Sequence, residues 1–285
     1  MGYGDDIMAT GEARMVKKQK PNLNIVFGDG KKIYKSEIFK HNPYIYQGDE
    51  LESNKEYYWI NNYIGNRPYI DYKKTNSKKI FWKKNFNCTR GDIYFDENEE
   101  KNGQQISEKA IKIWQKYFNK KPKILVIIEP VVKSESYQKT SGAKIIGDTH
   151  LNRDWGFENW QKVVDAFKEN VAFLQPFRGN VRKLKGVLDV DCNFRNAAAI
   201  LKYSDLFIGN HGGFTHAAAA LNKPAVNIFG GWISPEITGY KSHFNFYIDT
   251  PDSPCGYKTK CSHCYDCMKS IEVDSVIDTI KSFLK

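Results

Sequence analysis

A glycine-rich turn in the C-terminal half holds the residues best suited to bind an anion. The apolar run 206–208 ends in a glycine, and an alanine-rich stretch, 217–221, follows a few residues later. This pattern predicts a strand, a tight turn and a helix, in that order. The first amides of a helix have no intrahelical partner and lie at the positive end of its dipole. Gly212, Gly213 and His216 are therefore candidate phosphate ligands.

The same residues also admit a purely structural interpretation. Glycine turns precede many helices that bind nothing, and a histidine beside such a turn more often has a packing role. A motif of this size has a real false-positive rate, so both interpretations stay open on these residues alone.

The segment 205–231 resembles the nucleotide-sugar site of the heptosyltransferase-like enzymes, glycosyltransferase family 9. The family pattern is an apolar strand, Asn-Asp-[Thr/Ser]-Gly-x-x-His, an alanine-rich helix, Lys-Pro and a strand that ends in Phe-Gly. The matching residues are Asn210, His211, Gly212, Gly213, His216, Lys223, Pro224, Phe229 and Gly230. His211 stands where the family has aspartate, so a group that can be cationic replaces a carboxylate, and that aspartate's contacts cannot be transferred.

Two further segments extend the resemblance on the donor side. Arg153 lies in a stretch similar to the family's Lys-x-Trp-Pro motif, whose basic residue contacts donor phosphate, and a guanidinium suits bidentate phosphate contact. Ser234 lies in a segment similar to the family's loop beside the donor. The donor-binding residues implied by the resemblance are Arg153, Asn210, His211, Gly212, Gly213, His216 and Ser234.

The N-terminus resembles the family's opening loop, Gly-Asp-x-[Leu/Ile]-x-x-Thr-Pro-x-x-Arg. The matching residues are Gly4, Asp5, Ile7, Thr10 and Arg14, with Gly11 where proline usually stands. The resemblance implies that Asp5 is the catalytic general base. From the residues alone, Asp5 or Asp6 would cap the following helix. The strand that precedes this loop in the family is missing, so we expect either a truncated sequence or a first domain built without it.

A cysteine cluster lies near the C-terminus, at Cys255, Cys261, Cys264 and Cys267, with His263 inside it. Thiolates at this spacing suit a tetrahedral zinc or iron ion, and free thiols or a disulfide are the alternative. Some protein heptosyltransferases of the family carry an iron-binding cysteine finger. Four protein ligands leave no open position, so the metal would be structural, and no cofactor is expected for catalysis.

Composition limits the partners of this chain of 285 residues. The balance of 43 Lys and Arg against 33 Asp and Glu gives a formal charge of +10, which favours anionic partners. No apolar run approaches the roughly 18 residues of a transmembrane helix, and the N-terminus lacks the features of a signal peptide. We therefore expect a cytoplasmic protein without a transmembrane segment.

The predicted elements alternate between strands and helices, which predicts an α/β fold. Strands are expected at 22–27, 124–128, 171–174, 206–208 and 225–229. Helices are expected at 7–18, 107–118, 161–168, 193–203, 217–221 and 271–284, with an acidic loop at 96–105 and a polar loop after Pro130. The resemblance implies the GT-B architecture, with two Rossmann-like domains facing a cleft. We place the acceptor-side domain at 1–119, the nucleotide-sugar domain with its cysteine-rich loop 255–267 at 120–270, and a C-terminal helix at 271–285.

The function implied is inverting, metal-independent transfer of a sugar from a nucleoside-diphosphate sugar to a hydroxyl group. The expected acceptor is a surface glycan or a lipopolysaccharide-type saccharide. One alternative is a hydroxylated base in phage-type DNA, because lysines alternate with aromatic residues over 72–84. Another is a non-catalytic protein that binds nucleotide sugars or nucleic acid.

Overall fold

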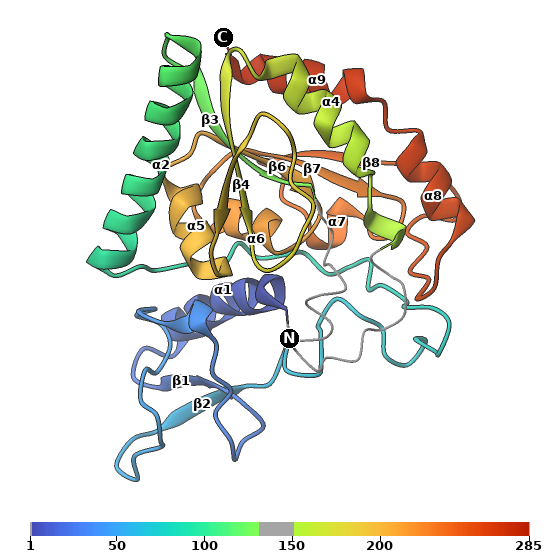
Figure 1. Cartoon of the computed structure of the whole chain (residues 1–285). Helices are drawn as coiled ribbons and strands as arrows, with labels where there is room; N and C mark the ends of the chain where they lie inside the picture. Colours follow the sequence, from blue (N-terminus) through green and yellow to red (C-terminus); the bar gives the residue numbers. More distant parts are fainter. Residues whose placement is uncertain (1, 131–150, 285) are drawn as a thin grey trace.

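A parallel sheet forms the centre of the computed structural model, which describes residues 2–130 and 151–284. The polar loop expected after Pro130 lies outside these residues. The strands of this sheet are β3 (Ile124–Glu129), β4 (Val171–Phe177), β5 (Leu188–Asp191), β6 (Leu206–Asn210), β7 (Ala225–Gly230) and β8 (Phe244–Tyr247). Their spatial order is β5-β4-β3-β6-β7-β8, and every neighbouring pair is parallel (Figure 1).

This strand order is that of a doubly wound nucleotide-binding sheet. The chain starts in the middle at β3, winds outward to β5, returns to β6 and then winds outward to β8. The order of connection therefore reverses between β3 and β6, and ligands of such sheets bind outside the carboxyl ends of the strands at this switch point.

Helices cover both faces of the sheet, so its central strands are apolar on both sides (Figure 1). Along β3, Leu125 and Ile127 belong to one buried cluster, while Val126 and Ile128 belong to the other. The first face is covered by α2 (Glu97–Phe118), α5 (Phe194–Lys202) and α6 (Gly213–Ala220). The second face is covered by α4 (Phe157–Phe167), α8 (Ser262–Lys269) and α9 (Val273–Lys281).

The N-terminal part lies below this sheet in Figure 1, with α1 against α6. It contains α1 (Tyr3–Gln19), β1 (Asn24–Phe27), the short helix η1 (Glu37–Phe39) and β2 (Tyr57–Ile60). β1 and β2 form a two-stranded parallel sheet. The α/β class with a mostly parallel sheet is confirmed. The described N-terminal residues, however, contain a sheet of only two strands and not a full doubly wound sheet.

One predicted loop is wrong. Residues 96–105 were expected to be an acidic loop, but α2 begins at Glu97 and includes most of them. The Asp96 carboxylate accepts a hydrogen bond from the Glu99 amide at 2.8 Å, and the Glu99 carboxylate accepts one from the Asp96 amide at 3.0 Å. This reciprocal capping box starts the helix well before its apolar residues, which the hydrophobic period alone did not reveal.

At the C-terminus, the expected helix 271–284 is α9 followed by η3 (Ser282–Leu284). The remaining short helices are η2 (Leu151–Arg153) and α7 (Pro235–Thr238). None of the helices in the described parts of the chain has both the length and the apolar character needed to span a membrane. The division into domains stays a prediction.

Candidate functional site

The glycine turn lies at the switch point of the sheet. β6 ends at Asn210, directly beside the end of β3 at Glu129. The Asn210 side chain accepts a hydrogen bond from the Trp155 amide at 3.3 Å and donates one to the Pro130 carbonyl at 3.1 Å. Asn210 therefore connects the backbone segments around the site. Because its side-chain amide already makes these two hydrogen bonds, its role in the site is to support the backbone.

The first turn of α6 meets the first turn of α1. A Cβ atom on Gly213 would lie 3.8 Å from the Gly4 amide nitrogen. The Gly212 amide donates to Thr215 Oγ1 at 3.3 Å, so it is already bonded within the turn. Two helix N-termini thus lie side by side, and their positive dipole ends favour an anion at this junction.

His216 lies at this junction with its two nitrogens on different sides. Its Nδ1 is 2.8 Å from the Tyr240 hydroxyl. Its other edge lies against α1, because a Cβ atom on Gly4 would come within 2.7 Å of Cδ2 and 3.3 Å of Nε2. Only glycine at position 4 admits the ring there. Burial lowers the pKa of His216 to about 4, so the imidazole is neutral at neutral pH.

His211 is a neutral group as well. Its ring stacks on Phe229 with centroids 4.2 Å apart, and its Nε2 lies 3.2 Å from Thr238 Oγ1. Its Nδ1 is buried and has no partner among the described residues. Burial, reinforced by the nearby His216 ring and the charge of Arg153, lowers the pKa of His211 well below its usual range. The exchange of the family's aspartate for His211 therefore removes a negative charge without adding a positive one.

Arg153, at the end of η2, supplies a positive charge to the site. Its guanidinium carbon lies 4.9 Å from the centroid of the Trp232 ring, and its Nε is buried without a partner in the described parts of the chain. Burial, followed by the positive charge of Arg67, lowers the pKa of Arg153 to about 10, which leaves it charged at neutral pH. An unpartnered buried guanidinium nitrogen is suited to an anionic ligand.

Asp5 lies in the first turn of α1, on the other side of His216. It is 6% exposed and accepts a hydrogen bond from the Tyr69 hydroxyl at 2.6 Å and from Arg67 Nε at 2.9 Å. Each carboxylate oxygen has two lone pairs, so Asp5 can still accept a further proton or hydrogen bond. The capping alternative is wrong for Asp5 and Asp6 alike, because the N-cap of α1 is Gly2.

Asp6 points to different partners. Its carboxylate accepts a hydrogen bond from Ser36 Oγ at 2.7 Å, and the Tyr34 hydroxyl lies at 3.5 Å. Burial raises the pKa of Asp6 to about 6. The residue is therefore close to half protonated in mildly acidic solution, although it lies beside Asp5 in the sequence.

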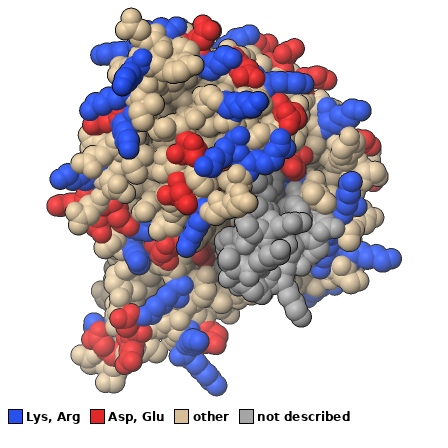
Figure 2. Space-filling view, in the orientation of Figure 1, with Lys and Arg blue, Asp and Glu red and all other residues tan. Residues whose placement is uncertain are grey.

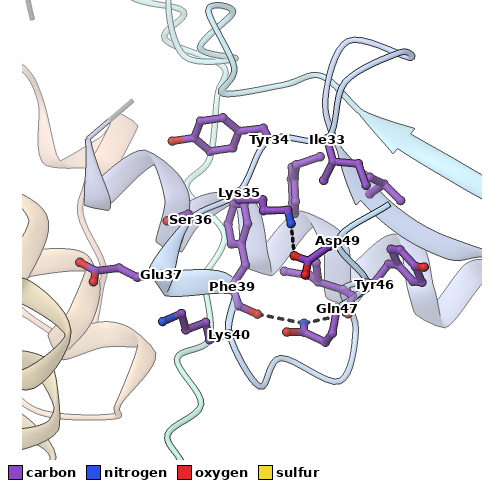
Figure 3. A pocket seen from close by; sticks show the side chains of 14 residues that line it. Ile33, Tyr34, Lys35, Ser36, Glu37, Phe39, Lys40, Tyr46, Gln47 and Asp49 are labelled. Atoms are coloured by element: carbon purple, nitrogen blue, oxygen red, sulfur yellow. Dashed lines mark hydrogen bonds and ion pairs between the residues drawn. The ribbon is translucent and has the colours of Figure 1, made fainter. Parts of the chain in front are cut away.

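Ser36 also lines a pocket of about 360 Å³ in the N-terminal part (Figure 3). The pocket begins at the carboxyl end of β1, and Figure 3 shows Lys35 and Asp49 pointing toward one another as an ion pair. Tyr34 and Tyr46 contribute aromatic walls. Through Ser36 and Asp6, this pocket adjoins the first turn of α1.

Ser234, the last donor-side residue implied by the resemblance, caps α7. Its Oγ accepts a hydrogen bond from the Glu236 amide at 3.1 Å, and the side chain is buried. Its position as an N-cap explains the local Ser-Pro sequence without any ligand.

The cysteine cluster forms a compact set of ligands. One ligand atom each from Cys255, Cys261, His263 and Cys264 lies within 4.8 Å of the others. Cys255 Sγ and Cys264 Sγ are 2.7 Å apart, and this hydrogen bond lowers the pKa of the Cys255 thiol. Cys267 lies next to this group, with its Sγ 3.5 Å from His263 Nε2. The compact group therefore contains His263 in place of Cys267, which the sequence had predicted as the fourth ligand.

Sequence reasoning also missed Arg67, Tyr69 and Tyr240. Arg67 and Tyr69 lie in a basic and aromatic stretch without any recognisable motif, and Tyr240 lies beyond the segment with the family pattern. Each reaches the site only through long-range packing, so no local signal marks it.

One comparison with known proteins covers a part of this site. Residues 184–265 match the profile of glycosyltransferase family 9 (heptosyltransferase). The matched segment contains the glycine turn, His211, His216, Ser234 and most of the cysteine cluster, whereas Asp5 and Arg153 lie outside it. The chain is heptosyltransferase-like over this segment.

Individual relatives cover parts of the chain. Lipopolysaccharide heptosyltransferase 1 of Campylobacter coli is 35% identical over 80 residues, which is 28% of this chain and 23% of that protein. A family 9 glycosyl transferase from Veillonella parvula superposes with a TM-score of 0.44 and 15% identity, over 68% of this chain and 53% of its own. The E. coli ADP-heptose lipopolysaccharide heptosyltransferase II superposes with a TM-score of 0.42 and 12% identity, over 72% of this chain and 54% of that protein. The chain therefore spans about a quarter of the curated relative and about half of each solved structure.

Proposed function

We propose that this heptosyltransferase-like chain transfers a sugar from a nucleoside-diphosphate sugar to a hydroxyl acceptor. The observation that carries the proposal is the junction of the α1 and α6 N-termini at the switch point of the sheet, where His216 lies. Arg153 is close enough to His211, in the same glycine turn, for its charge to lower the pKa of that ring. This arrangement is suited to a diphosphate, because two dipole ends and an imidazole donor meet at the junction and a buried guanidinium lies near the same turn.

On the donor side, these groups would stabilise the leaving group. When the bond between the anomeric carbon and the diphosphate breaks, negative charge develops on the phosphate oxygen. Arg153, His216 and the first amides of α6 would hold that charge in a site with little water. Protein groups thus supply the stabilisation, and we propose transfer without a catalytic metal.

On the acceptor side, Asp5 would accept the proton of the attacking hydroxyl in a single, inverting displacement. Its hydrogen bonds from Arg67 and Tyr69 fix the carboxylate near His216, so the base and the leaving group lie on two sides of one junction. Replacement of such a base costs about 10²- to 10⁴-fold in turnover. The pocket beside Ser36 is then on the acceptor side of Asp5.

We prefer a saccharide acceptor to DNA. In the stretch 72–84, Trp82 packs edge-on against Trp232 at 5.0 Å and stacks on Tyr69 at 6.3 Å. Lys79 lies over the Tyr257 ring. Trp82 is thus engaged within the protein, whereas Tyr72 of the same stretch is 46% exposed. The relative in Campylobacter coli is a lipopolysaccharide heptosyltransferase, and we extend its class of acceptor to this chain.

We also propose a structural metal ion at the cysteine cluster. Three thiols and an imidazole within 4.8 Å of one another match the soft ligands of zinc or iron. When bound, the ion would hold the loop around Cys255 and Cys261 onto α8. No catalytic step uses it.

Thermal-shift measurements test the donor proposal. We expect one of UDP, ADP, GDP, CDP and their common sugars to raise the unfolding temperature, because ligand at about 100 times its dissociation constant adds roughly 2.7 kcal/mol of stability. His216→Ala should lose most of this shift. His41→Ala, which removes an exposed histidine near Asp96 in the N-terminal part, is the control and should keep the shift. If no nucleotide shifts the wild-type protein, while DNA binds with a steep salt dependence, the donor proposal fails.

A further inference from the structure

Two buried side chains and the partly buried Cys88 form a hydrogen-bonded chain behind the anion site. Cys88 Sγ lies 3.3 Å from the Tyr240 hydroxyl, and this hydroxyl lies 2.8 Å from His216 Nδ1. Tyr240 and His216 are 9% and 4% exposed, so no bulk water competes for the hydrogen bond between them. Cys88 belongs to the N-terminal part, whereas Tyr240 follows α7 and His216 lies in α6.

We propose that Tyr240 is a positioning residue that fixes the tautomer of His216, so that Nε2 carries the proton and faces the anion site. The part of this inference that concerns ligand binding rests on the proposed function, in which the anion is the diphosphate of the donor. The tautomer itself is a property of the free protein. Tyr240 does not touch the ligand site directly and acts only through the imidazole.

The direction of the hydrogen bonds follows from the strength of the acceptors. A neutral imidazole has one N–H donor and one bare nitrogen, and a bare ring nitrogen is a much stronger acceptor than a thiol sulfur. The Tyr240 hydroxyl therefore donates to His216 Nδ1 and not to Cys88. Burial raises the pKa of Cys88 to about 12, so its S–H remains and donates to the Tyr240 oxygen.

With Nδ1 acting as acceptor, the proton of the neutral ring must be on Nε2. This nitrogen lies on the edge of the ring that contacts the first turn of α1, at the position that only glycine admits. The N–H bond is thus presented at the junction of the two helix N-termini. His216 supplies a hydrogen-bond donor without a charge, and Arg153 supplies the charge.

Nitrogen-15 NMR of protein labelled in its histidine rings tests the tautomer directly. The His216 signals, identified by their loss in His216→Gln, should have the pattern of a neutral ring protonated at Nε2 in the wild-type protein without ligand. Tyr240→Phe should change this pattern toward the Nδ1-protonated form. Tyr203→Phe removes a hydroxyl that contacts Glu100 away from the site and should leave it unchanged.

Two results would overturn the inference: a wild-type ring protonated at Nδ1, or the same tautomer in the wild type and Tyr240→Phe. The NMR outcome does not depend on ligand, so failure of UDP, ADP, GDP and CDP alike to bind the wild-type protein would count against the proposed function alone.

Affinity for ADP separates positioning from a general structural role. Tyr240→Phe should raise the ADP dissociation constant about five- to tenfold, the effect of about one hydrogen bond. Tyr203→Phe should leave it unchanged. Weaker ADP binding in Tyr240→Phe with an unchanged His216 tautomer would mean that Tyr240 only supports the fold, which contradicts the proposal.

Discussion

Asp5 and Asp6 are neighbours in the first turn of α1, yet their surroundings differ. Asp5 is paired with Arg67 and receives a hydrogen bond from Tyr69. Asp6 is buried, has no Lys or Arg partner among the described residues and receives its hydrogen bond at 2.7 Å from Ser36. The helix dipole favours both carboxylates, but of the two only Asp5 is paired with a guanidinium. This difference assigns the two residues to different roles and makes Asp6 a destabilising charge above its pKa.

Asp6→Asn should stabilise the protein at alkaline pH. Burial raises the pKa of Asp6 from 3.8 to about 6, so the folded state holds this proton more tightly than the unfolded state. The free energy of unfolding therefore falls as pH rises between these values, and the loss, roughly 2 to 3 kcal/mol, is complete above the folded pKa. Asparagine keeps an oxygen acceptor for Ser36 and cannot ionise.

Urea unfolding at about pH 8 and about pH 4 measures this effect. We expect Asp6→Asn to exceed the wild type in stability at the higher pH by on the order of 1 to 3 kcal/mol, with the gap closing at the lower pH. Asp278→Asn, on the exposed side of α9, is the control and should change little at either pH. Equal stability of Asp6→Asn and the wild type at the higher pH would mean that Asp6 is not penalised by burial.

At the scale of elements, the loop before α8 has little core of its own. Cys255, Cys261 and Cys264 turn their thiols toward one another and toward His263. The rest of the loop is held by the Asn152 side chain, which donates to the carbonyls of residues 257 and 259 at 3.0 and 2.8 Å. A metal ion would convert this cluster from a set of hydrogen-bonded thiols into a fixed junction between the loop and α8.

Removal of the metal should therefore destabilise the C-terminal elements. We expect metal analysis to find about one zinc or iron ion per chain. A strong chelator should lower the unfolding temperature by roughly 5 °C or more. Cys264→Ser should have the unfolding temperature of the chelator-treated wild type. Cys192→Ser, which changes a thiol outside the cluster, should have that of the untreated wild type. Protein purified without metal and insensitive to chelator would show that the cluster is a group of free thiols.

At the scale of the whole molecule, Arg195 joins the N-terminal part to the large sheet. It is buried in α5, donates to the Glu37 carbonyl at 2.8 Å and pairs with Glu99 at 2.7 Å through a second nitrogen. The same guanidinium donates to the Tyr94 carbonyl. One side chain thus connects η1, the segment before α2, and α5. The charges on the surface are not concentrated at one point in this way. Figure 2 shows Lys and Arg spread among acidic residues over the visible face.

Arg195→Ala should cost about 3 kcal/mol or more of stability, because it leaves a partly buried carboxylate and two carbonyls without their donor. Arg182→Ala, which removes an exposed pair with Glu158, should cost less than about 1 kcal/mol. Urea unfolding gives both values. Hydrogen exchange should rise around η1 in Arg195→Ala. Similar costs for the two variants would contradict the proposed role of Arg195 as the junction.

Local patterns in the sequence determined the glycine turn and the strands β3, β4, β6 and β7 of the large sheet, whereas β5 and β8 were not predicted. Continuous apolar runs at 124–128 and 206–208 predicted buried parallel strands, because a strand covered on both faces has no polar side. The glycine turn before His216 predicted the start of α6. The resemblance added the candidate residues Asp5 and Arg153. These signals are contained in a few consecutive residues, which is why they can be recognised without a structure.

The tertiary structure alone decided which side chains meet. Arg67 and Tyr69 reach Asp5 across more than 60 positions of the sequence, and Tyr240 reaches His216 from beyond α7. His263 joins the thiols because α8 turns it inward, and burial leaves His211 and His216 neutral. The charge and tautomer of a buried group depend on desolvation and on partners from distant segments. The sequence could therefore nominate the site, but only the packed molecule fixed its electrostatics.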